Sequence, residues 1–346
     1  WGGKGFVTFA GRTPGPEAVA VNAGIARTLR KGAKPFALPA GCAVHDRPTV
    51  AGKVTVGTGR FALSADNGNE YRVSPRLDNA TLDLAARLVT GLKLGKGATP
   101  DILSVSLSAT DYIGHGFGTE GTEMCIQMAN LDSALGQFFS KLDRTGLDYA
   151  VVLTADHGGL DLPERLASQA LPSAMRVDPA LAPQALGKAI SAKLGLGTFV
   201  PKLGQGGPVA RGEPPSLIYA EGPGGEYYVT RDLPPDLRNK VIAELAATLK
   251  ASPQVEAVFT RDEVARARVP FGHPQDWTLI ERVRASYDPE RSADVITLLR
   301  RAVVPIIEAS PGYVATHGSV WDYDRRVPML FWRKGLRGFE QPSPVE

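Results

Sequence analysis

A strand–helix–strand segment between residues 102 and 153 constrains the fold of this chain more than any other part of its sequence. Residues 102–106 (ILSVS) and 149–153 (YAVVL) are short apolar runs that predict two buried strands. Residues 122–144 predict an amphipathic helix between them. Its apolar side chains recur at spacings of three and four residues, at Met124, Met128, Leu131, Leu135, Phe138 and Leu142. Two strands joined by a crossover helix imply a parallel pair, so we predict an α/β sheet.

The rest of the chain predicts a core with a smaller insert. A length of 346 residues corresponds to two domains, or to one large domain with insertions, at a prior of about 150 residues per domain. In the N-terminal part, helices are predicted over 16–30 and from Asn79, a suitable N-cap, to the glycines that begin at Gly91. Residues 160–290 differ in composition, because they contain many prolines and two glycine-rich loops, 204–207 and 222–225. We interpret this stretch as an α+β insert. Its predicted elements are strands over 216–220 and 255–260 and a helix over 237–249, and core strands are predicted to resume at 294–299 and 327–332.

Charge and hydropathy exclude several classes of partner. Lys and Arg number 39 and Asp and Glu 36, so the formal charge is only +3, too small and too dispersed to predict a specific nucleic-acid partner. The apolar run 302–307 is short and is interrupted by Pro305, so we predict no membrane span. For the two cysteines, Cys42 and Cys125, the sequence leaves open one disulfide or two buried free thiols.

Three of the five histidines stand in short polar clusters beside predicted strands. Asp111 and His115 follow the first strand, Asp156 and His157 follow the second, and His317 precedes the last. Polar residues just past strand ends are where α/β sheets bind ligands. Carboxylate oxygens and neutral imidazole nitrogens are the usual zinc ligands outside all-thiolate sites. Five such groups exceed one tetrahedral zinc ion, so the sequence predicts two.

A plainer interpretation exists for each cluster taken alone. A single Asp–His pair after a strand is more often a helix cap or a hydrogen-bonded turn. Three clusters at the strand ends of one sheet favour metal binding over that reading. The other two histidines, His45 and His273, lie beside prolines in loops and are interpreted as surface or structural residues.

Other motifs are absent or incomplete. Gly95-Lys96 is followed by Gly97 where a phosphate-binding loop needs Ser or Thr. No Gly-x-Ser-x-Gly nucleophile elbow is present, and the glycine-rich stretches do not stand between a strand and a helix. Met124 and Met128 are predicted to be core residues.

Three sequence segments together resemble the zinc alkaline phosphatase superfamily. They are VSLSATDYIGHGFGTEG, VVLTADHGG and ATHGSVWDYDRRVPMLFW, in this order, and they are most similar to the monomeric, threonine-nucleophile branch of the Sphingomonas and PafA type. The resemblance implies a three-layer α/β sandwich with a mostly parallel central sheet. It assigns residues 1–160 and 291–346 to an alkaline-phosphatase-like core that is incomplete at both ends, and 161–290 to an insert or cap.

The resemblance also implies a ligand set. The first zinc ion would be held by Asp111, His115 and His317, and the second by Asp156 and His157. In the family, an Asp, the nucleophilic Thr, an Asn and a Lys-x-Arg pair lie upstream of these motifs. None is visible in this sequence, so the nucleophile is expected outside it.

Two threonines near the metal motifs are the candidates for a replacement nucleophile. Thr154 corresponds to a structural residue of the family. Thr110 would have to reach across the ion that it helps to frame. Neither is therefore expected to carry the chemistry.

By resemblance, the function is hydrolysis of phosphate monoesters at a two-zinc site through a phospho-enzyme intermediate. The alternatives are a nucleotide pyrophosphatase or phosphodiesterase, which shares all five ligands, and a non-catalytic zinc-binding fragment. A structural zinc domain is disfavoured, because its ligands would more often be cysteines. The resemblance further implies small phosphate esters as substrates, a monomer, and a periplasmic or secreted location. A structural Ca²⁺ is compatible with the sequence.

Overall fold

The computed structural model describes residues 1–196 and 216–342, and these divide into two compact units. The first unit comprises Trp1–Leu162, Ala309–Thr316 and Val327–Arg337, and the second comprises the remaining described residues, including His317–Arg326. The predicted glycine loop 204–207 lies outside the described residues. No described helix combines the length and the apolar character needed to cross a bilayer.

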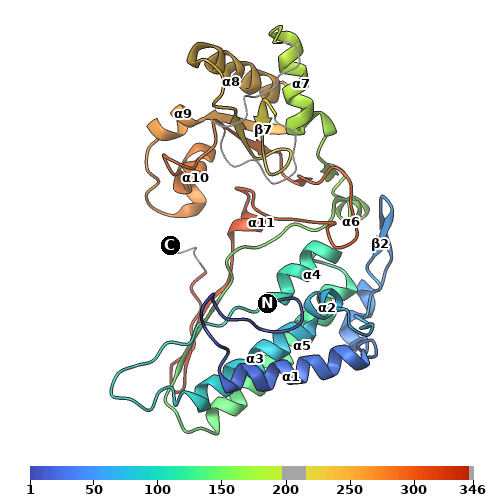
Figure 1. Ribbon diagram of the computed structural model, residues 1–346, viewed down its shortest axis with the longest axis vertical. Coiled ribbons are helices and arrows are strands. Elements are labelled where there is room, and N and C mark those ends of the chain that lie inside the picture. Colours follow the sequence, from blue (N-terminus) through green and yellow to red (C-terminus); the bar gives the residue numbers. More distant parts are fainter. Residues whose placement is uncertain (197–215, 343–346) are drawn as a thin grey trace. The chain divides into compact units, whose positions relative to one another are not determined.

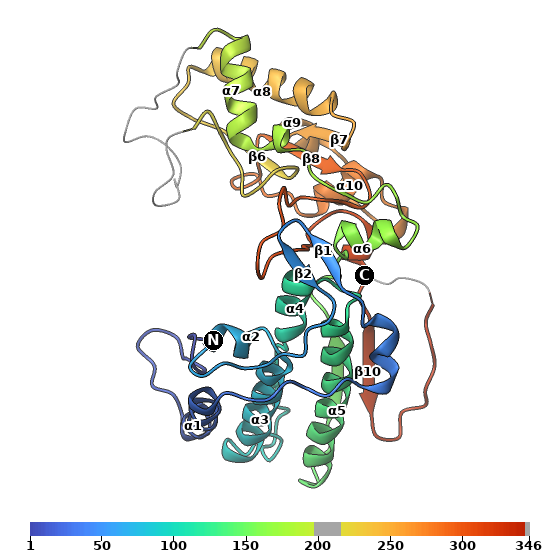
Figure 2. The ribbon, with the colours of Figure 1, turned by 90° about the vertical axis from the view of Figure 1, so that its right-hand side faces the viewer.

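Helices dominate the first unit. Its elements are α1 (Pro16–Lys31), η1 (Ala40–His45), β1 (Thr49–Ala51), β2 (Val54–Val56), α2 (Gly68–Arg72), α3 (Pro75–Gly91), α4 (Ala109–Phe117), α5 (Thr122–Asp143), β3 (Ala150–Thr154) and β10 (Met329–Arg333). Helix α3 lies between α1 and α5 and packs against both (Figure 1, Figure 2). Helix α1 buries Val21, Ile25 and Leu29, which are four residues apart and therefore share one face.

The predicted helices are confirmed, with one corrected boundary. Helix α1 spans the predicted 16–30 and α5 the predicted 122–144. Helix α3 begins at Pro75 rather than after Asn79, because proline suits the first helical position and Ser74 precedes it in extended conformation. It ends at Gly91, as predicted. On α5, Met124 and Phe138 are buried, but Met128 is 50% exposed, so the prediction of a core Met128 is wrong.

The predicted parallel pair of strands is also wrong. Residues 102–106 form no strand, although Val105 and Leu107 pack against the buried residues of α3 and α5. Strand β3 pairs antiparallel with β10, with Thr154 opposite Met329 and Ala150 opposite Arg333. An apolar run becomes a strand only where another strand pairs with its backbone, and none of the described residues pairs with 102–106. The side chains of β3 are exposed or partly exposed along the whole strand rather than buried as predicted, and Val152 is 63% exposed.

The two cysteines form a disulfide. The Sγ atoms of Cys42 and Cys125 are 2.02 Å apart, and this bond connects η1 to the first turns of α5. The alternative of two free thiols is therefore excluded. Next to Cys125, Met124 and Ile126 pack with Ile113 of α4 in one buried cluster. The disulfide thus lies beside the core on which α4 rests.

The second unit is built around a four-stranded antiparallel sheet of order β5-β6-β8-β7. Its elements are α6 (Pro163–Ser168), β4 (Met175–Arg176), η2 (Pro179–Leu181), α7 (Pro183–Lys193), β5 (Ile218–Tyr219), β6 (Glu226–Val229), α8 (Pro235–Lys250), β7 (Val255–Thr260), α9 (Arg261–Arg266), η3 (Pro274–Asp276), α10 (Leu279–Ala285), β8 (Val295–Leu299), β9 (Val303–Val304) and α11 (Asp322–Arg325). Strands β4 and β9 form a short parallel pair.

Both faces of this sheet are covered. Helices α7 and α8 pack on one face and α10 on the other (Figure 2). The side chains of β8 alternate between the two faces of the sheet. Val295 and Leu299 pack toward α7 and α8, and Ile296 and Leu298 pack in the cluster of α10. The apolar run 294–299 predicts a core strand, and β8 is that strand, buried along its whole length. Its pattern does not reveal which sheet contains it, and the structure places it in the second unit.

Helix α9 begins with a capping box, which gives a testable contribution to stability. The Thr260 hydroxyl accepts a hydrogen bond from the Glu263 N–H, and the Glu263 carboxylate accepts one from the Thr260 N–H. We expect Thr260→Ala to lower the free energy of unfolding of the second unit by about 1 kcal/mol. Urea denaturation at pH 7 measures this loss, and an unchanged midpoint would contradict it.

The loss of stability caused by Thr260→Ala should depend on pH. Hydrogen bonds from the Thr260 N–H and then from its hydroxyl lower the pKa of the Glu263 carboxyl below its ordinary value. A lowered pKa in the folded state stabilises the fold above the unfolded pKa, and this stabilisation is lost as the pH falls through the folded pKa. Thr260→Ala removes the hydroxyl that contributes to this lowered pKa. The difference in the free energy of unfolding between wild type and the variant should therefore become smaller as the pH falls.

Candidate metal centre

Helix α4 carries two of the predicted ligands on one face. Asp111 and His115 are four residues apart, so their side chains lie one above the other, and the Asp111 Oδ1 is 3.4 Å from the His115 Nε2. The opposite face is anchored by Ala109 and Ile113, which are fully buried. Burying Ile113 contributes about 2 kcal/mol, enough to fix a nine-residue helix that would be marginal alone.

The C-terminal end of α4 is tied to residues 314–315. The carbonyl of His115, in the last turn of the helix, accepts hydrogen bonds from the N–H groups of Val314 (2.7 Å) and Ala315 (3.3 Å). The helix then ends at Gly118, whose φ of 84° suits glycine. The segment that leads into His317 is therefore held directly against the helix that carries Asp111.

The loop after β3 supplies the next pair. The His157 Nε2 is 3.7 Å from the Asp111 Oδ1 and 3.7 Å from the Asp156 Oδ1. The Asp156 side chain is 89% exposed, whereas those of His157 and Asp111 are half-buried. A single carboxylate oxygen of Asp111 thus lies between the imidazoles of His115 and His157.

The hydrogen bonds of the two imidazoles determine which nitrogen can bind a cation. The His115 Nδ1 lies 2.9 Å from the Ala315 carbonyl oxygen, and the His157 Nδ1 lies 2.8 Å from the Gly158 carbonyl oxygen. A carbonyl oxygen only accepts, so each Nδ1 must carry the proton and donate it. In the neutral ring the lone pair is then on Nε2, the nitrogen that lies nearest to Asp111 in both residues. Such an outer hydrogen bond is the usual support of a metal-binding histidine.

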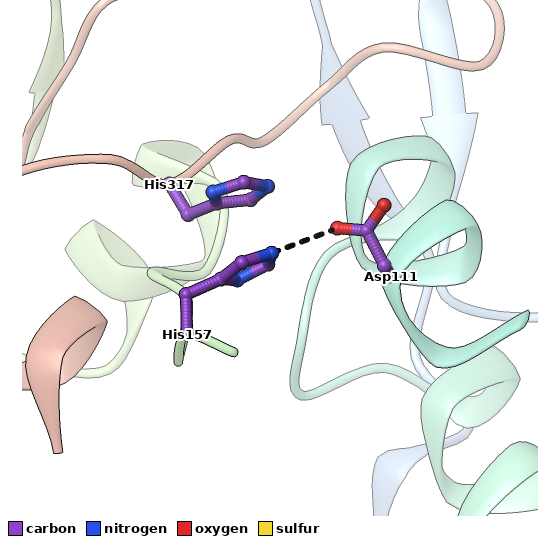
Figure 3. A group of neighbouring side chains, drawn as sticks. All are labelled: Asp111, His157 and His317. Atoms are coloured by element: carbon purple, nitrogen blue, oxygen red, sulfur yellow. Dashed lines mark ion pairs between the residues drawn. The ribbon is translucent and has the colours of Figure 1, made fainter. Parts of the chain in front are cut away.

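His317 completes the predicted set. Each of Asp111, His157 and His317 offers one ligand atom, and these atoms lie within 4.8 Å of one another (Figure 3). His317 directly follows residue 316 of the first unit and precedes Gly318, whose φ of 106° requires glycine. The group combines residues that the resemblance assigns to two different ions, and that assignment stays a prediction.

The donor set fits a metal ion such as zinc. It consists of imidazole nitrogens and carboxylate oxygens, the ligands of zinc sites with an open position. A carboxylate oxygen and the lone pairs of neutral imidazoles repel one another at these distances. A cation in their midst turns this repulsion into attraction.

The remaining sequence candidates lie outside this cluster. His45 and His273 are exposed, as predicted. The Thr110 hydroxyl accepts a hydrogen bond from the Gln127 Nε2 at 3.1 Å, and the Thr154 hydroxyl is exposed and donates to the Ala155 carbonyl. Each of these hydroxyls makes a hydrogen bond to a residue that is not a predicted ligand.

Two buried polar residues that bind the first turn of α4, Asp78 and Gln127, are not among the candidates from the sequence. Both are polar, and at most 1% of either residue is exposed. A signal was available in the pattern of α3, because Asp78 lies in line with the buried Leu82, Ala85 and Val89 at spacings of four, three and four. An acid on the apolar stripe of a helix requires a buried partner.

Comparisons with known proteins identify the relatives of this chain. A sequence profile described as type I phosphodiesterase / nucleotide pyrophosphatase matches residues 45–324. The chain is 48% identical over 346 residues to an alkaline phosphatase, PhoK, of Sphingomonas, and 42% identical over 328 residues to an alkaline phosphatase, PhoD, of Zymomonas mobilis. These alignments cover 100% and 94% of this chain but only 59% and 54% of the relatives, so the chain spans little more than half of their length.

The fold has a solved counterpart. The crystal structure of the alkaline phosphatase PafA matches with a TM-score of 0.73 at 22% identity, over 97% of this chain and 61% of that one. This match confirms the alkaline-phosphatase-like α/β fold. Because the phosphodiesterase profile covers most of the sequence and includes all five histidines and both Asp–His pairs, this chain belongs to the type I phosphodiesterase / nucleotide pyrophosphatase family.

Proposed function

We propose that this chain contributes the metal-binding residues of a phosphatase that hydrolyses phosphate monoesters. The observation that carries the proposal is the position of the Asp111 Oδ1, 3.4 Å from the His115 Nε2 and 3.7 Å from the His157 Nε2. Relatives at 48% and 42% identity are named alkaline phosphatases, which favours monoesters.

The proposed metal is zinc, with two ions per site. Asp111, His115 and His317 would hold one ion, and Asp156 and His157 would contribute to the second. Zinc would supply charge stabilisation for the oxygens of the reacting phosphate and would make hydroxyl groups more acidic. Phosphoryl transfer depends chiefly on such positioning and charge.

The residues of this chain would act by orientation. The Ala315 and Gly158 carbonyls hold the rings of His115 and His157 with their Nε2 atoms toward Asp111. We place the nucleophile, a threonine in the resemblance, outside this sequence. In support of this, the hydroxyls of Thr110 and Thr154 are already engaged in hydrogen bonds.

We also propose a monomer in a periplasmic or secreted location. The Cys42–Cys125 disulfide supports this location, because disulfides persist in oxidising compartments and are rare in the cytosol.

A second candidate is a phosphodiesterase, which the profile match favours. The test compares p-nitrophenyl phosphate with its bis-ester, using a purified protein that contains both this sequence and the nucleophile, before and after removal and return of zinc. We expect zinc-dependent turnover that is higher for the monoester. Faster hydrolysis of the bis-ester would favour the phosphodiesterase, and zinc binding without turnover of either would favour a non-catalytic zinc-binding protein. The control variant is His273→Ala, which removes an exposed histidine outside the cluster.

A further inference from the structure

Two buried polar side chains and the partly buried hydroxyl of Thr110 meet at the N-terminal end of α4. The Asp78 Oδ1, from α3, accepts a hydrogen bond from the Ala109 N–H at 3.0 Å. The Asp78 Oδ2 accepts one from the Gln127 Nε2, from α5, at 2.7 Å. The same Nε2 donates its second proton to the Thr110 hydroxyl at 3.1 Å. The first two residues of α4 are thus connected to both neighbouring helices.

Asp78 takes the place of a cap that α4 lacks. Ser108, at the N-cap position, makes no side-chain hydrogen bond to the first turn. The N–H groups of a first turn have no partners inside the helix, and they attract negative charge. The carboxylate of Asp78, on α3, provides both a hydrogen-bond acceptor and a negative charge for this first turn. It binds the N–H of Ala109, two residues before Asp111.

This arrangement is costly to maintain in a core. Burial raises the pKa of the Asp78 carboxyl, and the hydrogen bonds from Ala109 and Gln127 only counteract that rise. Well-packed apolar side chains of similar volume would often serve stability as well as a buried charge does. Unlike an apolar side chain, the Asp78 carboxylate binds one particular backbone N–H at the start of α4.

We propose that Asp78 and Gln127 are positioning residues, which fix the first turn of α4 and thereby hold Asp111 and His115 in the metal-binding arrangement. This inference rests on the proposed metal centre. The inference goes beyond that centre, because it makes the affinity and geometry of the metal site depend on two residues that are not ligands. Asp78 lies 31 positions before Ala109, and Gln127 lies 17 positions after Thr110.

The test exchanges the two side chains. Gln127→Glu places a second carboxylate against Asp78, so two acids would face each other in a buried site. The double variant D78N/Q127E restores a pair of one amide and one carboxylate, with the two groups exchanged. An asparagine at position 78 can accept from the Ala109 N–H and donate to a glutamate at position 127, to which the Thr110 hydroxyl can also donate. The readouts are the affinity for Co²⁺ and Zn²⁺, by competition with a chromophoric chelator, and the visible spectrum of bound Co²⁺.

We expect Gln127→Glu to weaken metal binding by about 10-fold, the lower end of the effect of residues that hydrogen-bond a metal ligand directly, and to alter the Co²⁺ spectrum. The double variant should return to near the wild-type affinity. The matched control is Glu123→Gln, on the same helix. Glu123 is equally buried and accepts hydrogen bonds from the N–H groups of Gly57 and Gly59, outside the predicted ligand segments. The Glu123→Gln substitution should reduce the stability of the fold without changing the affinity for metal.

The outcomes separate the two proposals. If the wild-type protein binds neither metal, the metal centre is wrong and the positioning role falls with it. If wild type binds but Gln127→Glu binds equally well, the positioning role alone is overturned. Equal losses in Gln127→Glu and Glu123→Gln, or no recovery in the double variant, would also overturn it. Hydrogen exchange in the interior of α1, which holds none of the substitutions, confirms that each variant is folded.

Discussion

The variant Asp111→Asn should lose most of its bound metal and nearly all of the proposed phosphatase activity. Asparagine has the same shape, so the fold of α4 should persist, but the charge between the imidazoles of His115 and His157 is removed. Loss of an inner ligand should exceed the effect of about 10–100-fold that is typical of outer partners. A lost metal ion corresponds to about 4 kcal/mol of transition-state stabilisation, or about 1,000-fold in turnover.

Zinc content by elemental analysis and the rate with p-nitrophenyl phosphate measure this prediction. The matched control is Asp148→Asn, the same change at an exposed carboxylate that pairs with Arg333 on the two-stranded sheet. The control should keep both zinc and activity. An Asp111→Asn variant with full zinc content would refute the metal centre.

Removal of the Cys42–Cys125 disulfide should have the largest effect on stability. The bond joins residues 83 positions apart. In the chain-entropy account, closing a loop of this length lowers the entropy of the unfolded chain and stabilises the fold by about 4.5 kcal/mol. A loss of this size is a large part of the whole stability of a typical domain.

Urea unfolding of C42S/C125S, with hydrogen exchange of α3 and α5 as the probe, reports on the first unit alone. The same change should follow from a reductant added to wild type, and the reductant should not affect the double variant. A loss below about 1 kcal/mol would show that the unfolded chain is already compact without the bond. Because Met124 and Ile126, on either side of Cys125, pack with Ile113, we also expect α4 to exchange faster.

The helices could be predicted because their signals are local. The apolar spacing on α1, α5 and α8 and the proline at the start of α1 each involve residues within a few turns. The predicted ligands could be named for a similar reason. Asp111 and His115 are close in sequence, as are Asp156 and His157, and the resemblance of the three segments supplied the link to His317.

The strands could not be predicted with the same success, because a strand is completed by another part of the chain. The run 102–106 has the composition of a strand but no partner among the described residues. Met128 has the spacing of a core residue but faces outward, because nothing in the described chain fully covers that part of α5. Likewise, the apolar run of β8 predicts a core strand but not the sheet that it joins.

By itself, the sequence determined the helices α1, α3, α5 and α8, the five candidate ligands and the family. It could do so because periodicity and motif chemistry are written into neighbouring residues. Only the tertiary structure decided that Cys42 bonds to Cys125, that β3 pairs with β10, and that Asp78 and Gln127 hold the first turn of α4. Each of these connects residues far apart in the chain, and such contacts depend on how the elements pack rather than on any local pattern.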